Sequence, residues 1–540
     1  MKEKVKTPYP GPLTYVLGID KLFWLLLIVS AVIPILYFSY VPIWDGWQFS
    51  RCYMMSATKG TLDCFKHSAI LHTFLFSLTQ RIDLGNFRLI YTLNLLFWIL
   101  GLVSFRSLVQ YLFGSRLSPA NLTLLAFCFG LNPVFLVQII QPSLDFTLPI
   151  LLVVVLLFLF KSRFVYAALA GVLMVFTKES GFMLYGVGVF LFIPLMIFND
   201  PALLKDKKSF VKKIGVLFIP IVSFVAYMVI VPHTQIGNSW TEGILKMLRF
   251  YLLDKIIAAQ LVSLLVINFN WVITAIVLIN VIVMCAAYLK SPDHNAGART
   301  VFSDKYEGVY FYVSFVAIIY FLTRIPFVNN PRYMLPALPI LIILLGASLA
   351  RVLRKQPLIT VTLTALLVLL TASSFRTVDP VSKKIMGMFK FGSHELLQMA
   401  RFDPPIHGYE RDQLVYNFEF TQFHYITEKI FRKVGWARYF VIPREVTWLP
   451  DFGSFDTETG HRAIYGDKVR SLSFSYSDEI TSSNKIPYEI YYISYPNYDR
   501  NNMNANNRAQ LSSLYDLKEI IPVENDGYSI EVYRYVSKND

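Results

Sequence analysis

Charged residues are scarce in this sequence. Lysine, arginine, aspartate and glutamate make up 16% of the 540 residues, whereas a soluble globular chain usually carries about 25%. Hydrophobic residues account for 55% and aromatic residues for 16%. This balance argues against an ordinary soluble enzyme and predicts an integral membrane protein.

Cysteine is scarce too, and four residues are too few for a disulfide scaffold. Cys128 and Cys285 lie inside apolar runs, where a buried and inert thiol is expected. Cys52 and Cys64 share one polar loop that we expect outside the cytoplasm, where a disulfide can form. Their Cα separation cannot be read from the sequence, so the pairing stays open here.

The usual soluble nucleotide-binding signatures are missing. The sequence has no Walker-type phosphate loop, no GxGxxG after a strand and no nucleophile elbow. The net charge of +14 suggests nucleic acid, but much of it lies in short clusters between apolar stretches, such as 205–213. Charge placed that way orients helices in a bilayer and builds no continuous basic face. We therefore exclude nucleic acid as a partner and expect any donor substrate to be carried in the membrane.

Long apolar stretches recur through the first 375 residues and then stop. Since a helix needs about 20 apolar residues to cross the hydrocarbon, we expect a polytopic α-helical membrane protein with about eleven transmembrane helices. The predicted spans are 22–42, 87–113, 119–140, 143–160, 164–177, 181–198, 214–231, 264–289, 307–323, 332–351 and 357–375.

The distribution of lysine and arginine predicts the orientation. The basic clusters fall on one side of the predicted spans, which should be cytoplasmic together with the N-terminus. The opposite side then holds residues 43–86, the turns at 178–180 and 324–331, the loop 232–260 and the whole C-terminus. Because eukaryotic retention signals are not obvious, a bacterial inner membrane fits best, with the C-terminal domain in the periplasm.

Residues 376–540 have the composition of a separate extracytoplasmic domain. Strand-like runs occur at 438–442, 488–494 and 528–536, and 421–434 has the pattern of an amphipathic helix. Polar, turn-rich segments such as 495–507 separate them. About 165 residues can bury their own core, so we expect a small α/β domain after the transmembrane domain 1–375.

Asp45 is the first candidate site residue, because it lies between Trp44 and Trp47 immediately after the first predicted span. A carboxylate there can take a proton from an acceptor hydroxyl, and the indoles can stack on a sugar. The alternative is an interfacial aromatic belt with one solvated carboxylate. His67, which follows Lys66, can meet a phosphate or shuttle protons, although a positively charged helix start is the simpler explanation.

Ionisable residues at the outer ends of other spans form the second group of candidates. Asp145 is either a second active-site carboxylate or a helix-start residue stabilised by the helix dipole. Lys178 can neutralise a phosphate and Glu179 can orient it, or both belong to a polar turn. Arg324 and Arg332 lie on the outer side, against the orientation rule, which favours anion binding over simple snorkelling.

In their order and predicted sides, these features resemble the GT-C class of membrane glycosyltransferases, notably relatives of the protein O-mannosyltransferases and lipid A aminoarabinose transferases. The resemblance covers about residues 20–375. Its landmarks are the acidic residue of the first outer loop (Asp45), the His-led segment from His67, the Thr-Lys-Glu-Ser-Gly turn at 177–181 and the Arg-Tyr-Met-Leu-Pro-Ala-Leu-Pro run at 332–339. Two departures concern the sugar and the acceptor: Gly46 stands where many mannosyltransferases have Glu, and the segment after His67 lacks a frequent Pro.

The resemblance implies transfer of a sugar from a polyprenyl-phosphate carrier to an extracytoplasmic acceptor, with inversion at the anomeric carbon. Asp45 would be the general base. Lys178 and Arg332, with His67, would stabilise the departing phosphate, and Asp145 would be a secondary site residue, with Glu179 counted among the groups that bind substrate or phosphate. Fixed cations could remove the need for a metal, so no cofactor is expected beyond the lipid-linked sugar, although nothing in the sequence rules out a divalent ion.

Three other functions stay open at this level. A transporter or flippase of lipid-linked sugars predicts repeated halves and polar residues near the middle of spans, whereas the candidates here cluster at outer ends. An oligosaccharide polymerase or ligase would share the membrane setting. A scaffold that binds a partner through the outer domain is only weakly disfavoured.

Overall fold

A computed structural model describes the following residues: 20–40, 42, 44–60, 69–199, 206–230, 261, 263–289, 305–324, 331–353, 355–375, 381, 384–385, 388, 390–391, 394–395, 418, 429–435, 437–442, 473–482, 487–494, 503–525 and 528–538.

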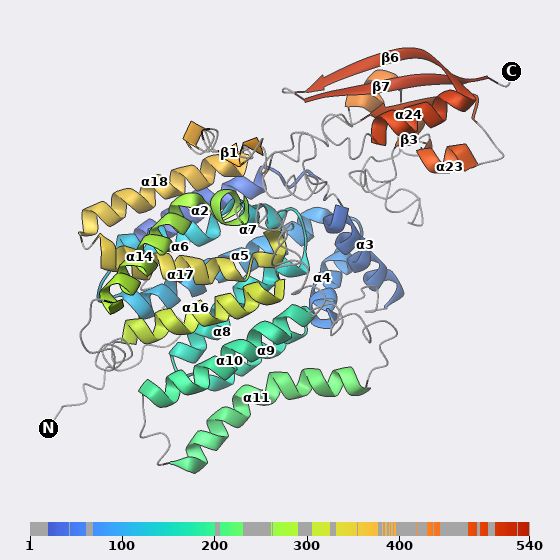
Figure 1. Cartoon of the computed structure of the whole chain (residues 1–540). Helices are drawn as coiled ribbons and strands as arrows, with labels where there is room; N and C mark the ends of the chain where they lie inside the picture. The colour runs from blue at the N-terminus through green and yellow to red at the C-terminus, as the bar shows by residue number, and fades with distance from the viewer. Residues whose placement is uncertain are drawn as a thin grey trace.

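Helices build the first part of the chain, and Figure 1 shows them as one block beside a smaller sheet near the C-terminus. Inside the block lies α8 (Leu144–Phe160), which packs on α5 (Phe87–Phe113), α9 (Phe164–Val175), α10 (Glu179–Asn199) and α17 (Ala337–Val352). Because α8 is apolar on nearly all sides, it is suited to the centre of a helical membrane protein.

The eleven predicted apolar stretches coincide with helices of the block. The remaining described helices surround α8 and its neighbours. They are α2 (Lys21–Ile35), α3 (Trp44–Lys59), α4 (Ile70–Ile82), α6 (Pro119–Gly130), α7 (Pro133–Leu136), η1 (Val137–Ile139), α11 (Lys207–Ile230), η3 (Ser263–Asn268), α14 (Trp271–Leu289), α16 (Lys305–Arg324), η5 (Pro331–Met334) and α18 (Gln356–Phe375).

Several of these helices are long enough to cross a bilayer. Within the described residues, four helices meet the length and hydropathy needed, or five if the bent pair α6 with α7–η1 is one span. Shorter apolar helices occupy the positions of other predicted spans. The surface is apolar as well, because side chains such as Ile28, Leu169 and Val222 are more than half exposed, which suits contact with hydrocarbon. The total of about eleven spans and their orientation stay predictions.

The predicted span 119–140 is not one straight helix. Its two halves are bent by 62°, between α6 and the segment α7–η1. A new helix starts at Asn132, whose side chain accepts a hydrogen bond from the N–H of Val134, and Pro133 has no N–H to continue α6. At the bend, Gly130 lies so close to Leu102 of α5 that a Cβ would fall 2.5 Å from it. The bend thus follows from local sequence and close helix packing.

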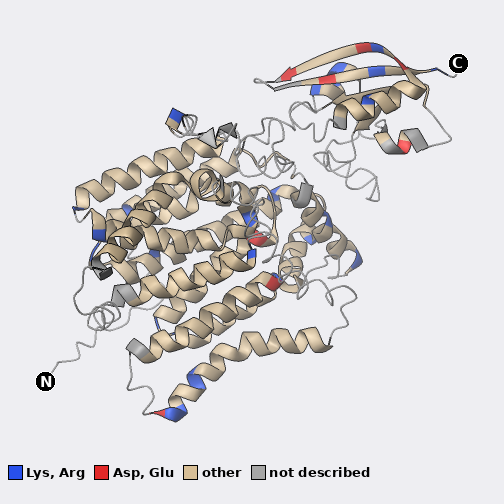
Figure 2. Cartoon of the chain, in the orientation of Figure 1, with Lys and Arg blue, Asp and Glu red and all other residues tan. Residues whose placement is uncertain are grey.

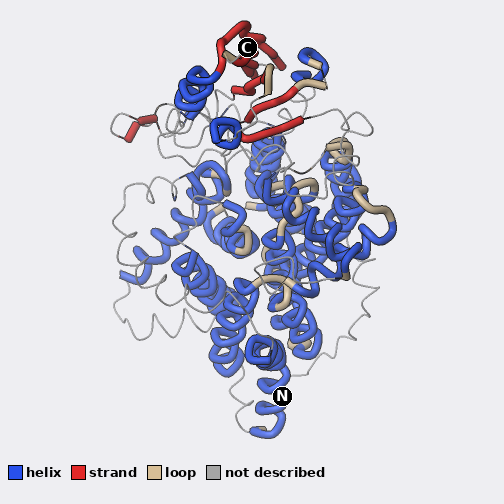
Figure 3. Tube along the Cα trace, turned by 90° about the vertical axis from the view of Figure 1, so that its right-hand side faces the viewer, coloured by secondary structure: helices blue, strands red, loops and turns tan. Residues whose placement is uncertain are grey.

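The C-terminal part forms a five-stranded mixed sheet, which Figure 3 shows at one end of the helical block. Its strands are β3 (Tyr439–Ile442), β4 (Ser473–Tyr476), β5 (Glu489–Ser494), β6 (Tyr515–Asn525) and β7 (Tyr528–Ser537), in the order β4-β3-β5-β7-β6. β3 pairs in parallel with β4 and β5, whereas β7 pairs antiparallel with β5 and β6. A separate two-stranded pair joins β1 (Lys390–Phe391) to β2 (His394–Glu395).

The sheet confirms three predicted strands and adds elements that were not predicted. β3, β5 and β7 lie where the strand-like runs were found, while β4, β6, α23 (Ser477–Ser482) and α24 (Met503–Leu514) are additional. The turn-rich interpretation of 495–507 was wrong for 503–507, which begin α24. Of the predicted helix 421–434, residues 429–434 are helical and 421–428 lie outside the described residues.

The sheet has two apolar faces. Val441, Tyr492 and Tyr535 pack with Leu511 of α24 in a cluster of their own. On the other face, residues such as Phe440 belong to the continuous core that also contains residues of the helical block. Successive side chains of a strand point to opposite faces of the sheet, so neighbouring residues of one strand belong to different clusters.

Candidate functional site

Asp145 lies in the first turn of α8, in the interior of the helical block. The segment before it is fixed by a hydrogen bond from Ser143 Oγ to Gln138 Oε1 at 2.9 Å. A helix N-terminus favours a carboxylate through its partial positive charge. The carboxylate of Asp145 is 2% exposed, so it needs further positive partners.

Lys178 supplies one partner from the turn between α9 and α10. Its Nζ donates to Asp145 Oδ1 at 2.7 Å, and its side chain is 9% exposed. The turn is held by the hydroxyl of Thr177, which donates to the carbonyl of Leu173, and by the N–H of Gly181, which donates to the carbonyl of Lys178. A Cβ at Gly181 would lie 2.1 Å from the backbone carbonyl oxygen of residue 174, so the tight turn requires glycine.

Arg332 supplies a second partner from η5, the short helix before α17. Its Nε lies 3.7 Å from Asp145 Oδ2, and its side chain is 8% exposed. The two oxygens of Asp145 thus face different cations, one from residue 178 and one from residue 332. Three segments that are far apart in the sequence meet at one carboxylate.

Tyr333 lies close to both cations. Lys178 Nζ is 4.4 Å and Arg332 Cζ is 5.1 Å from the centre of its ring. Tyr320 of α16 fixes the backbone here, because its hydroxyl donates to the Tyr333 carbonyl at 2.7 Å. Arg324, at the end of the same helix, has its Cζ 5.9 Å from the Tyr320 ring. Cation–π contacts of this kind hold cations in desolvated surroundings.

Asp45 and His67 can be placed only in part. Asp45 belongs to α3, but its side chain lies outside the described residues, as does all of His67. The next residue of α3, Gly46, approaches the side chain of Gln141 so closely that a Cβ would fall 2.7 Å from it. Because Gln141 precedes Asp145 by four residues, the start of α3 lies beside the segment that leads into α8.

Glu179 is the first residue of α10 and is partly exposed. Of the predicted set, the contacts given above join Asp145, Lys178 and Arg332. Tyr333 was missed, although its position directly after Arg332 in an outer turn was a usable signal. Ser180 was missed as well: its hydroxyl is buried without a hydrogen-bond partner among the described residues.

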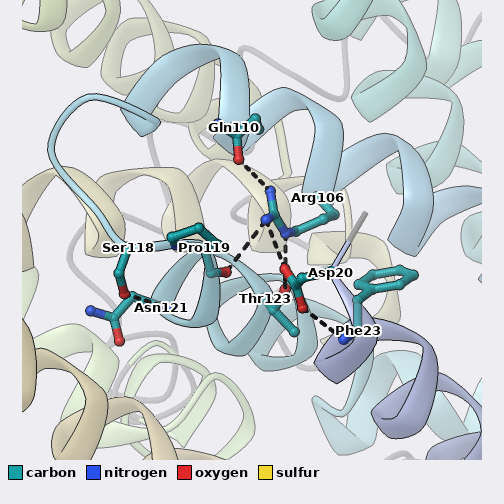
Figure 4. Close-up of polar contacts among 8 residues, drawn as sticks. All are labelled: Asp20, Phe23, Arg106, Gln110, Ser118, Pro119, Asn121 and Thr123. Atoms are coloured by element: carbon teal, nitrogen blue, oxygen red, sulfur yellow. Dashed lines mark hydrogen bonds and ion pairs between the residues drawn. The ribbon is translucent and has the colours of Figure 1, made fainter. Parts of the chain in front are cut away.

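A second buried polar cluster lies at a different place in the block, and Figure 4 shows its contacts. Arg106 of α5 forms an ion pair with Asp20 at 3.0 Å and donates to Thr123 Oγ1 and to Gln110 Oε1, each at 2.9 Å. The hydroxyl of Thr123 donates to Asp20 Oδ2 at 2.8 Å. These bonds tie the start of α2 to α5 and α6.

The carboxylate of Asp20 is stabilised in its charged form. Partial burial raises its pKa, but hydrogen bonds from Thr123, Arg106 and the N–H of Phe23 outweigh burial and lower the pKa overall. This cluster was not predicted, although Arg106, which lies well inside the long apolar stretch 87–113, was a signal for it. Figure 2 shows how sparsely lysine, arginine, aspartate and glutamate occur along the helices of the block.

The described cysteines differ in their chemical state. Cys52 is disulfide-bonded, Cys128 and Cys285 carry free thiols, and Cys64 lies outside the described residues. The prediction of a buried thiol is confirmed for Cys128 and wrong for Cys285, which is exposed on α14.

Within the described part of the chain, no group of three or more His, Cys, Asp and Glu residues could hold a metal ion. The cations of the Asp145 cluster are the groups suited to an anionic ligand.

Comparison with known proteins gives a distant structural likeness. No family model and no curated protein matches the sequence. The structure of ArnT from Cupriavidus metallidurans bound to undecaprenyl phosphate is similar over 97% of this chain and 98% of that chain, with a TM-score of 0.48 and 13% identity. Its apo state is similar over the same shares, with a TM-score of 0.46 and 12% identity.

Proposed function

We propose that this chain is a GT-C-like glycosyltransferase that moves a sugar from a polyprenyl-phosphate carrier to an acceptor outside the cytoplasm. The observation that carries the proposal is the buried charge cluster, in which Lys178 and Arg332 both face the carboxylate of Asp145. Two cations and one carboxylate leave one positive charge in excess within that contact set. A phosphate is a ligand that can neutralise such an excess.

The surroundings of the cluster suit a lipid-linked phosphate. The helices that carry Asp145 and follow Lys178 are strongly apolar, and exposed faces of the block are apolar as well. A polyprenyl chain can lie along such surfaces in the hydrocarbon while its phosphate reaches the cations. The buried hydroxyl of Ser180, two residues after Lys178, is a further group that can bond to a polar ligand.

The proposed reaction is a single displacement. Asp45 accepts the proton of the acceptor hydroxyl, and the acceptor oxygen forms a bond to the anomeric carbon of the sugar. The bond between that carbon and the phosphate oxygen breaks, and its electron pair leaves with the polyprenyl phosphate. Lys178 and Arg332 stabilise the negative charge that develops on the phosphate, which makes them the groups whose loss should slow the chemical step.

The experiment is mass spectrometry of envelope glycolipids and glycoproteins from cells that carry the wild type, a deletion, Asp45→Asn, Lys178→Met or Lys161→Met. Lys161 is a matched control, because it follows the opposite end of α8 from Asp145. Immunoblots of the membrane fraction show that each variant is present at the wild-type level.

We expect the deletion, Asp45→Asn and Lys178→Met to remove the same sugar, and Lys161→Met to keep it. Loss of one electrostatic partner in a transition state typically slows a reaction on the order of 100-fold or more, enough to empty a steady-state product pool. If the deletion removes a sugar but Asp45→Asn does not, the assignment of the base is wrong. If no variant changes any glycan, the transferase proposal fails and a transporter or scaffold takes its place.

A further inference from the structure

A basic groove lies on the C-terminal sheet, away from the Asp145 cluster in the sequence and in the fold. Its volume is about 340 Å³, and its lining consists of Lys429, Arg432, Lys433, Val523 and Glu524. The three cations occupy positions i, i+3 and i+4 of the helical residues 429–434 and are exposed. They therefore share one face of the helix.

The opposite face of this helix fixes it in place. Ile430 and Phe431 are completely buried, and the Phe431 ring lies 4.9 Å from that of Phe440 in β3. These residues belong to the continuous apolar core that includes the transmembrane helices. The cations are thus presented by a helix packed on the same core as the membrane-embedded part of the chain.

The two lysines are held by backbone carbonyls of β6. Lys429 Nζ donates to the carbonyl of Glu524 at 3.3 Å, and Lys433 Nζ donates to the carbonyl of Pro522 at 2.6 Å. β6 lies at the edge of the described sheet, where the carbonyls of residues 522 and 524 point to the same side of the strand. Each ammonium group has three donors, so further donors remain for a ligand.

Positive charge predominates among the lining residues of the groove. Three cations stand there beside one carboxylate, that of Glu524. Like charges at this helical spacing repel one another, and a bound anion relieves the repulsion. Arginine can grip two phosphate oxygens at once while lysines add point charges, so this set of side chains suits a phosphate.

We propose that this basic groove binds the phosphate of an anionic lipid headgroup and so fixes the C-terminal sheet at the membrane surface. This site is independent of the proposed sugar transfer, because none of its residues belongs to the Asp145 cluster. The link to lipid rather than to free phosphate rests on the helix 429–434, whose buried face is continuous with the core of the membrane helices.

The test is hydrogen–deuterium exchange of the full chain in nanodiscs of phosphatidylcholine alone or with phosphatidylglycerol. We expect anionic lipid to slow amide exchange several-fold in 429–435 and 520–524, and high salt to weaken the effect. The double variant Lys429→Gln/Lys433→Gln should lose this protection. The matched control Lys518→Gln, an exposed lysine elsewhere on β6, should keep it, and unchanged exchange in α5 shows that each variant is folded.

Inorganic phosphate added to phosphatidylcholine nanodiscs separates the two sources of phosphate. If it gives the same protection as phosphatidylglycerol, the lipid assignment is overturned and the groove binds free phosphate. If neither addition protects the segment, or if the double variant is protected like the wild type, the groove is not an anion site.

Discussion

In the Asp145 cluster one carboxylate faces two cations, so substitutions of the carboxylate and of a cation should change the free energy of unfolding by different amounts. Asp145→Asn removes the carboxylate that contacts both Lys178 and Arg332 in the described cluster. Lys178→Met removes one cation, but Asp145 keeps Arg332 at 3.7 Å and the N-terminus of α8. We therefore expect Asp145→Asn to be the more destabilising substitution.

The burial of the cluster sets the size of the expected loss in free energy of unfolding. Breaking a buried ion pair typically costs about 3–5 kcal/mol, because the remaining charge is left uncompensated in a desolvated site. Asp145→Asn should cost an amount at or above the upper end of this range, since both cations lose their contact with this carboxylate, and Lys178→Met an amount at or below the lower end. The double variant Asp145→Asn/Lys178→Met should lose less free energy of unfolding than the two single variants together, because it leaves no lysine without this carboxylate.

Unfolding can be followed with a fluorogenic thiol reagent in a Cys285→Ser background. Cys128 is completely buried, so it reacts when the helical block opens, and the substitution removes the reaction of the second free thiol of the described residues, Cys285. Adding a polyprenyl phosphate should stabilise Asp145→Asn more than the wild type, because its phosphate replaces the missing anion. Equal costs for both single variants, strict additivity in the double variant, or no ligand effect would refute the reasoning.

Three further predictions concern the packing around the site and at other buried polar groups. Gly181→Ala should lower the stability of the fold by about 1–3 kcal/mol, because its Cβ meets the carbonyl of the preceding turn. Gly186→Ala has open space around the new Cβ, so it should be neutral or stabilising by up to about 1 kcal/mol. Thermal unfolding of the two variants compares these effects. Burial lowers the pKa of His72 to about 3, so the folded state binds fewer protons and stability should fall as pH drops below about 6.5, by about 2 kcal/mol at pH 5; a His72→Phe variant titrated in parallel should lose this dependence. Asp20→Asn should cost more than Arg106→Met in unfolding experiments, because the arginine is 5% and the aspartate 25% exposed, and the reverse order would contradict the assignment of Arg106 as the buried partner.

The members of the site could be identified one by one from the sequence, because an ionisable residue in an apolar stretch is costly and therefore conspicuous. Asp145, Lys178 and Arg332 were each found in this way. Their contact could not be predicted, since it depends on the tight turn at Gly181 and on the packing of η5 against the start of α8. Single-sequence patterns carry no information on such long-range packing.

The helices followed from length and hydropathy, but parts of the C-terminal sheet did not. β6 contains Pro522, a residue that is rare inside strands, yet an edge strand tolerates proline because one side of its backbone is unpaired. The start of α24 is rich in asparagine, which favours turns. Tertiary contacts override that preference, for Tyr492 donates to Asn504 Oδ1 at 2.9 Å and Leu511 is completely buried.

The Arg106 cluster and the Asp145 cluster contain similar buried side chains, yet only the Asp145 cluster is proposed to bind a ligand. The balance of positive and negative charge in each cluster distinguishes them. Around Arg106, one cation meets one carboxylate, and the guanidinium nitrogens donate to Thr123, Gln110 and Asp20, which leaves little capacity for a ligand. Around Asp145, two cations share one carboxylate, so a bound anion improves the balance. A polyprenyl phosphate should therefore stabilise the folded chain through the Asp145 cluster and leave the contribution of the Arg106 cluster unchanged, which makes Arg106→Met a suitable reference for every ligand titration.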